Sequence, residues 1–185
     1  MIQTKLNNHC NFPNIIGGKL NDLVSSLVME HKGTFENKWV KHIDEYDVYG
    51  TTVKKRMYET DAKERYIHIY HSITKEGAER ALLSKKLRQM KSYMMQHTNE
   101  VIELGSRFSQ YYILHYNEDN EVFQFPEDRV DVIERENDLS GYFCIITSEE
   151  MSAKEALDLY KSRDVSEKLF RGDKSYLGDK SLRVY

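Results

Sequence analysis

The sequence predicts an α/β protein in which a strand-rich segment interrupts the main fold. Residues 141–147 form an almost wholly apolar run, typical of an interior strand, and a helical pattern follows them closely. Residues 45–140 are mostly strand-like but contain one long helical pattern. A chain of 185 residues is long enough for one domain with an insertion. We therefore expect a residual core strand and helix in 1–44, a β-rich insertion with one long helix in 45–140, and a strand and helix of the core in 141–185.

The first expected elements are a short strand and a helix. Residues 14–18 predict a strand that ends in a turn at the two glycines. Apolar residues then recur at helical spacing over 20–30, and Gly33 stands where a C-cap would end that helix. Trp39, the one tryptophan, is expected to be a packing residue.

The middle of the chain predicts a hairpin and the long helix. Strands over 49–58 and 65–71 are separated by a polar turn, as in a β-hairpin. A helix over 74–97 is indicated by apolar residues at intervals of four, three and four, namely Leu83, Leu87, Met90 and Met94. Two further strands and a charged junction are expected at 107–116, 122–125 and 127–137.

The closing helix has a start signal of its own. Ser152 and Glu155 have the S-x-x-E spacing of a capping box, in which each residue satisfies a backbone N–H of the other. Apolar residues at helical spacing follow, beginning with Ala156 and Leu157. A helix is therefore predicted to follow the strand at 141–147.

Composition limits the classes of function. The formal net charge of −3 is evidence against a protein that simply coats DNA phosphates, but a metal-dependent nuclease needs local carboxylates and is not excluded. No apolar run approaches the roughly 20 residues that cross a bilayer, and the N-terminus lacks the apolar stretch of a secretory signal. Cys10 and Cys144 are far apart and are interpreted as reduced thiols of a cytoplasmic protein.

Four chemically distinct residues share one face of the closing helix. Tyr160, Arg163, Glu167 and Lys174 are separated by three, four and seven positions. A carboxylate can hold a divalent cation, and a guanidinium and an ammonium can hold phosphate. Spacing of this kind more often marks a solvated helix face with weak ion pairs.

The spacing Tyr-(2)-Arg-(3)-Glu-(6)-Lys resembles the signature of bacterial insertion-sequence transposases with a DDE active site. The surroundings are also similar to that family: a Gly-aromatic-Phe strand ends in Thr147, a Glu-Lys-x-Phe run begins at Glu167, and a basic, leucine-containing tail begins at Lys174. The resemblance covers about residues 141–185. The strand-rich segment before it looks like the insertion that these transposases place ahead of the helix.

The resemblance implies a partial ribonuclease-H-like catalytic core. In the complete enzyme, two aspartates and one glutamate bind two Mg²⁺ or Mn²⁺ ions, which serve the cutting of transposon ends and their joining to target DNA. Glu167 would then be the catalytic glutamate and a metal ligand. Tyr160, Arg163 and Lys174 would bind DNA near the reacting phosphate. The expected partners are transposon and target DNA, and a second copy or an intact transposase, in a bacterial cytoplasm.

Two aspartates that the family needs are not evident. Asp22, Asp44, Asp47 and Asp61 stand in helix, loop or turn contexts, and none follows an apolar strand. The chain also stops at Tyr185, soon after the signature, so that it resembles a fragment and is expected to be inactive alone. A non-enzymatic fragment that binds DNA or inhibits an intact transposase is the alternative, and a relic without function is a third possibility.

Two other patterns suggest structure more than chemistry. His68 and His71 are three apart on a predicted strand, so they face opposite sides and are not expected to share a metal ion. The long helix is basic, and a solvated exterior is favoured over a DNA-facing surface because acidic residues dilute the charge. Its basic residues are Lys75, Arg80, Lys85, Lys86, Arg88 and Lys91.

Overall fold

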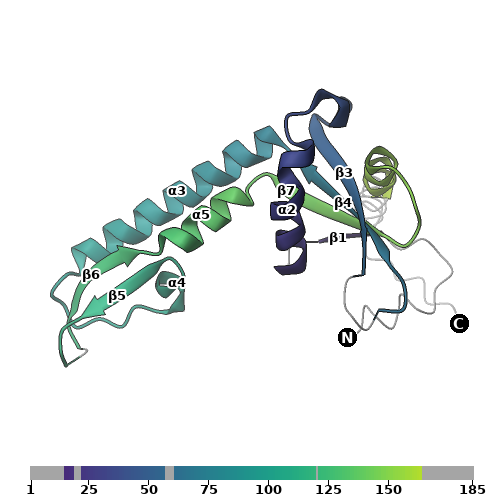
Figure 1. Ribbon diagram of the computed structural model, residues 1–185. Coiled ribbons are helices and arrows are strands. Elements are labelled where there is room, and N and C mark those ends of the chain that lie inside the picture. The colour runs from purple at the N-terminus through teal and green to yellow at the C-terminus, as the bar shows by residue number, and fades with distance from the viewer. Residues whose placement is uncertain (1–14, 19–21, 57–60, 120, 164–185) are drawn as a thin grey trace, which may run out of the picture. The chain divides into compact units, whose positions relative to one another are not determined.

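A computed structural model describes residues 15–18, 22–56, 61–119 and 121–163 (Figure 1). Over these residues the fold is mixed α/β, which confirms the predicted class. The chain divides into two compact units, unit 1 from Met1–His71 with Phe143–Tyr185, and unit 2 from Ser72–Tyr142. Among the described helices, none has the length and apolar character that a membrane span requires.

Unit 1 is organised on a five-stranded sheet with the order β1-β7-β4-β3-β2. The strands are β1 (Ile15–Gly18), β2 (His42–Ile43), β3 (Val48–Lys55), β4 (Arg65–His71) and β7 (Tyr142–Thr147). β1 pairs antiparallel with β7, β3 with β4, and β2 with β3. β4 occupies the centre, and all but one of its residues are buried. The strands predicted at 14–18, 49–58, 65–71 and 141–147 are thus confirmed where the structure describes them.

Helices cover the sheet of unit 1 from both sides. Figure 1 shows α2 (Asp22–Phe35) on one side of the sheet and the helical residues 153–163 on the other. Gly50 and Tyr70 are cross-strand partners that face this second helix, since the Tyr70 hydroxyl donates to the Ala153 carbonyl at 2.7 Å. A Cβ placed on Gly50 would lie 3.1 Å from that of Ala153. The glycine therefore permits the close approach of helix and strand.

The predicted end of α2 at Gly33 is wrong. The helix continues through Gly33, around which a Cβ would meet nothing within 4 Å, and ends at Phe35. Phe35 is fully buried, so the additional turn places a large apolar side chain in the core. The left-handed residue after the helix is Asn37, with φ of 54°, and asparagine tolerates this conformation better than most residues.

Trp39 is not the packing residue that was expected, because 78% of its surface is exposed. It begins the short helix η1 (Trp39–Lys41), and its ring stacks on His42 at 5.7 Å. His42 bonds to Asp44 at 2.7 Å and to Asp47 at 3.2 Å, and these bonds raise its pKa, that of Asp44 contributing most. The tryptophan therefore packs on a charged surface turn and not in the interior.

Unit 2 contains a long helix, two short helices and a two-stranded sheet. Its elements are α3 (Ile73–Gln96), α4 (Ser106–Ser109), β5 (Tyr112–Tyr116), β6 (Phe123–Asp128) and α5 (Val130–Asp138). β5 pairs antiparallel with β6. Leu83, Met90 and Met94 of α3 join a buried cluster with Tyr112 and Phe123 of the strands, and Leu87 packs against it. The predicted apolar stripe of the long helix is thereby confirmed.

Two predictions within unit 2 are wrong. The strand expected over 107–116 begins only at Tyr112, because the residues before it form α4, which buries Phe108. The charged junction expected over 127–137 is largely the helix α5. Two of its β-branched residues, Val132 and Ile133, pack against the buried cluster of unit 2, which an irregular junction could not do as efficiently.

The two ends of unit 2 lie next to each other. The backbone N–H of Ser72 donates to the Gly141 carbonyl at 3.0 Å, so the first and last residues of the unit are neighbours. Gly141 has φ of +84°, and a Cβ there would lie 2.7 Å from that of Glu76, so a side chain would not fit. The compact unit begins at Ser72 and not at residue 45, where the insertion was expected, because β3 and β4 are strands of the main sheet.

Candidate functional site

The helix that carries the start of the signature begins with the predicted capping box. The backbone N–H of Glu155 donates to the Ser152 hydroxyl at 3.2 Å, and the backbone N–H of Ser152 donates to the Glu155 carboxylate at 2.8 Å. These bonds lower the pKa of Glu155, the backbone bond from Ser152 contributing most. The reciprocal pair fixes the first residue of the helix and so the position of every later residue on it.

The same helix is held on the sheet by its apolar face. Ala156 and Leu157 are fully buried against Ile145 of β7 and Tyr70 of β4, and Tyr160 packs against the same cluster. Tyr160 is half-buried, so part of its ring serves packing. Because this face is packed on the sheet, the helix backbone that carries Arg163 is held in a fixed position.

A charged network joins the helix to the turn between β2 and β3. The Lys154 ammonium donates to Glu45 at 3.0 Å and to Asp158 at 2.8 Å. Hydrogen bonds from Lys154 first, and then from Tyr46, lower the pKa of the Asp158 carboxyl. The same contacts raise the pKa of Lys154. These groups are solvent-exposed, and their role is to orient the helix end more than to stabilise the fold.

The structure describes two of the four signature residues. Tyr160 and Arg163 are three residues apart on the helical segment 153–163, which places them on one face as predicted. Arg163 is exposed. Glu167 and Lys174 lie outside the described residues. The predicted role of the four residues in binding DNA and metal therefore stays a prediction.

A groove of about 660 Å³ lies beside the start of this helix, within unit 1. It is lined by η1 and the turn after it, by Gly50, Thr51 and Thr52 of β3, and by Ser152, Ala153 and Lys154. This groove was not predicted from the sequence. An isolated glycine inside a strand was its one available signal, since such a glycine often marks a close approach of another element.

A buried histidine links three strands of the sheet. His68 of β4 is fully buried, with Nδ1 2.9 Å from the Thr52 hydroxyl and Nε2 2.9 Å from the Thr147 hydroxyl. Because Thr147 donates its proton to the Glu149 carbonyl, it accepts from Nε2–H, and Nδ1 accepts from Thr52. Burial lowers the pKa of His68 to about 4. The imidazole is thus a neutral structural group, and His71, three residues on, faces the other side of the sheet as predicted.

The described carboxylates do not form the metal site that the family would need. Asp22 begins α2, Asp61 lies between β3 and β4, and Asp44 and Asp47 bond to His42. In the described part of the chain no three His, Cys, Asp or Glu side chains are arranged to hold a metal ion. The predicted role of Glu167 as a metal ligand stays a prediction, since Glu167 lies outside the described residues.

In comparisons with protein-family models, with curated proteins and with solved structures, nothing matches this chain. The assignment of a function rests accordingly on the residues and on their arrangement.

Proposed function

We propose that this chain is the C-terminal part of the catalytic region of a DDE transposase, which cuts and joins transposon ends by metal-assisted phosphoryl transfer. One observation carries the proposal: an interior strand, β7, leads directly into a capped helix that bears Tyr160 and Arg163 on one face. The spacing of Glu167 and Lys174 continues that face in the sequence.

Each signature residue has a role that fits its chemistry. Glu167 supplies one carboxylate to the metal site. Arg163 and Lys174 hold the DNA phosphate, the first through a planar fork and the second as a point charge. Tyr160, already fixed by packing, positions the turn of helix from which Arg163 extends. The divalent ions of the complete enzyme would supply a Lewis acid at the reacting phosphate.

The arrangement of unit 1 supports a ribonuclease-H-like core. A sheet with helices on both sides can hold catalytic groups at strand ends and on a flanking helix. In the sequence, unit 2 stands between β4 and β7, ahead of the signature, where the family places its insertion. This correspondence is the reason to prefer a transposase core to an unrelated α/β fold.

We further propose that these 185 residues do not cleave DNA alone. The reaction needs two more carboxylates near Glu167, and the described aspartates are separate from one another or bonded to His42. A partner segment that carries two strands ending in aspartate would complete the site.

Complementation tests this function. The DNA that flanks the reading frame is translated in all frames, and an upstream segment with two such strands is co-produced with this chain. With Mg²⁺ and a plasmid that carries the flanking ends of the element, we expect nicking at those ends. Glu167→Gln should abolish nicking, and Glu149→Gln, an acidic residue outside the signature, should retain it.

Either of two results would refute the catalytic role. Nicking that survives Glu167→Gln would show that the carboxylate is not a ligand. Mg²⁺-dependent nicking by the purified chain alone, lost in Glu167→Gln, would show that the missing carboxylates lie within these residues.

A second function, a non-enzymatic fragment that binds DNA or inhibits an intact transposase, is favoured by the scattered carboxylates. It requires the chain to bind DNA without metal. A gel shift in EDTA tests this requirement, and a complex that forms only when Mg²⁺ is present would count against it.

A further inference from the structure

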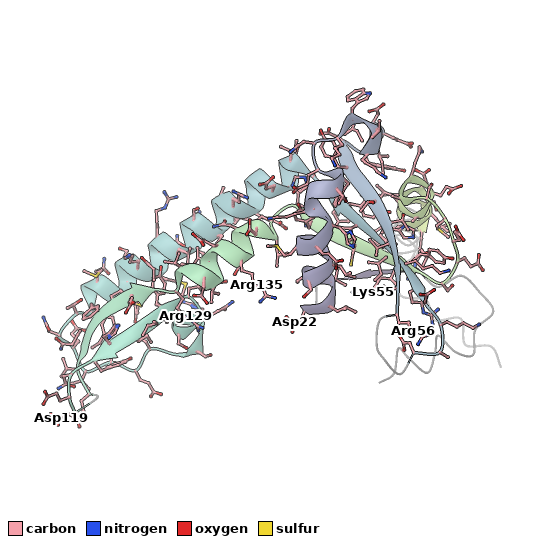
Figure 2. All side chains as sticks on the ribbon, in the orientation of Figure 1. Asp22, Lys55, Arg56, Asp119, Arg129 and Arg135 are labelled. Atoms are coloured by element: carbon pink, nitrogen blue, oxygen red, sulfur yellow. The ribbon has the colours of Figure 1, made fainter. Side chains whose placement is uncertain are left out.

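Four exposed basic residues, Lys54, Lys55, Arg56 and Lys63, lie at the turn end of the β3–β4 hairpin. Lys54 is neutralised locally, since its ammonium lies 3.5 Å from Glu64 and 5.4 Å from the centre of the Tyr66 ring. Lys55, Arg56 and Lys63, named here the hairpin cations, are exposed. Within the part of the chain that the structure describes, their side chains form no ion pair or hydrogen bond. Figure 2 labels Lys55 and Arg56 where β3 ends.

The basic helix α3 differs, because three of its six cations form ion pairs within unit 2. Lys75 pairs with Glu79 at 3.1 Å, Arg80 with Glu76 at 2.8 Å, and Lys91 with Asp128 at 2.8 Å. Unit 2 as a whole has nine basic and thirteen acidic residues, a net charge of −4. A polyanion therefore finds fewer available charges along α3 than its sequence suggests.

The hairpin is a rigid support for its cations. β3 and β4 are paired in register over seven residues, from Tyr49 opposite His71 to Lys55 opposite Arg65. β4 is the central strand of the sheet and is almost wholly buried. Lys55, the last paired residue of β3, therefore stands on an ordered backbone, which lowers the entropy lost when it binds a partner.

The shape of this surface suits duplex DNA. A two-stranded β-ribbon fits the major groove, which is about 12 Å wide. Lys55 ends β3, and Arg56 and Lys63 lie in the connection to β4, so the three cations come from one end of the ribbon and can contact neighbouring phosphates. Arg56 can form a paired hydrogen bond to one phosphate, whereas each lysine acts as a point charge.

We propose that the end of the β3–β4 hairpin is a phosphate-binding surface for double-stranded DNA, formed by Lys55, Arg56 and Lys63. The choice of DNA as partner rests on the proposed function, whereas the surface itself rests on the exposed cations. The surface involves neither Glu167 nor a metal ion. It would hold the duplex in position and would take no part in the chemistry.

Binding of a fluorescent duplex to the full chain in EDTA tests the surface. The test variant is K55Q/R56Q/K63Q, and the control is K85Q/R88Q on α3. The control removes two exposed cations that also lack an ion pair among the described residues. Affinity is measured by anisotropy at several salt concentrations, and melting of each variant confirms that it is folded.

Each lost phosphate contact should reduce the slope of log affinity against log salt by about 0.9. We expect the test variant to lose about two to three units of slope and at least roughly tenfold in affinity at low salt. The control should remain within about threefold of the wild-type chain. If the triple variant fails to fold, K63Q alone, which lies beyond the paired residues, should still lower the slope by about one unit.

The outcomes separate this surface from the catalytic proposal. Equal slopes for the test variant and the wild-type chain would overturn the surface, even if nicking still depended on Glu167. No binding of duplex by the wild-type chain in EDTA would overturn it as well. A reduced slope combined with nicking that survives Glu167→Gln would support the surface and refute the catalytic role of the glutamate.

Discussion

In each unit a buried tyrosine hydroxyl donates a hydrogen bond to a helix carbonyl, but the two units differ in how many of their cations form ion pairs. Tyr70 in unit 1 donates to the Ala153 carbonyl at 2.7 Å, and Tyr112 in unit 2 donates to the Leu87 carbonyl at 2.8 Å. Each hydroxyl thus ties a strand to a helix, and burial raises the pKa of both phenols. Three of the six cations of α3 form ion pairs within unit 2, whereas Lys55, Arg56 and Lys63 at the hairpin end of unit 1 form none among the described residues.

This difference shows that net charge is a poor guide to which cations stay available for a partner. The chain as a whole is acidic, and its most basic helix belongs to the more acidic unit. What matters for a polyanion is the number of cations that remain available after internal pairing. By that measure the small hairpin end is a better candidate than the long helix.

The largest expected effect is the loss of stability when a buried core residue is truncated, and we expect it to stay within the unit that carries the residue. Phe123→Ala removes a fully buried ring from unit 2 and should lower its free energy of unfolding by about 3 to 5 kcal/mol. Hydrogen exchange should become faster in α3 and β5 and stay unchanged in β4. The matched variant Ile69→Ala, in the buried centre of β4, should give the reverse pattern. Faster exchange in both units from either change would break the comparison.

The buried histidine should make unit 1 the acid-sensitive part. His68 has a folded pKa of about 4, below its ordinary value of 6.5, so its contribution is complete above pH 6.5 and is lost as the pH falls toward 4. The loss should reach about 3 kcal/mol in the free energy of unfolding of unit 1. Denaturant titrations at several pH values measure it, and the pH dependence should largely disappear in His68→Gln. Equal acid sensitivity in unit 2 would argue against this origin.

Two glycines should respond oppositely to the same substitution. In Gly50→Ala the new methyl group would lie 3.1 Å from both Ala153 and Ile43, and we expect a loss of about 1 to 3 kcal/mol. In Gly77→Ala, within α3, the methyl group would meet nothing within 4 Å, and a gain of about 0.5 to 1 kcal/mol is expected. The melting temperature of each variant, compared with that of the wild-type chain, tests this prediction. Shifts of the same sign would contradict the packing described for Gly50.

The smallest expected effect concerns the start of the signature helix. Ser152→Ala removes one half of the capping box and should cost about 1 kcal/mol. Exchange of the first amides of helix 153–163 should become faster, while the helices of unit 2 should be unaffected. Unchanged exchange at these amides would show that packing of Ala156 and Leu157 alone fixes the helix.

Much of unit 1 follows from local sequence. The apolar run of β7 and the Ser152–Glu155 box each specify an element by short-range physics, and both agree with the structure. The end of α2 could not be predicted in this way. Gly33 is a strong local stop signal, but the burial of Phe35 outweighs it, and burial depends on the rest of the fold.

Features of the site that depend on local sequence could be predicted, and those that depend on tertiary contacts could not. The helical spacing of Tyr160 and Arg163 is evident in the sequence. The groove beside Gly50, the exposure of Trp39 and the available hairpin cations are not, since each depends on which distant segments are neighbours. The ion pairs that neutralise α3 include a contact between Lys91 and Asp128, 37 residues apart, which no local pattern indicates.

The most direct test of the account is removal of unit 2. Ser72 and Gly141 are hydrogen-bonded neighbours, so residues 73–140 can be replaced by a short glycine-containing turn that joins β4 to β7. We predict that the shortened chain melts cooperatively and binds duplex DNA in EDTA within about threefold of the full chain, with the same salt slope. A shortened chain that folds but no longer binds DNA would place the DNA-binding surface in unit 2 and contradict the account.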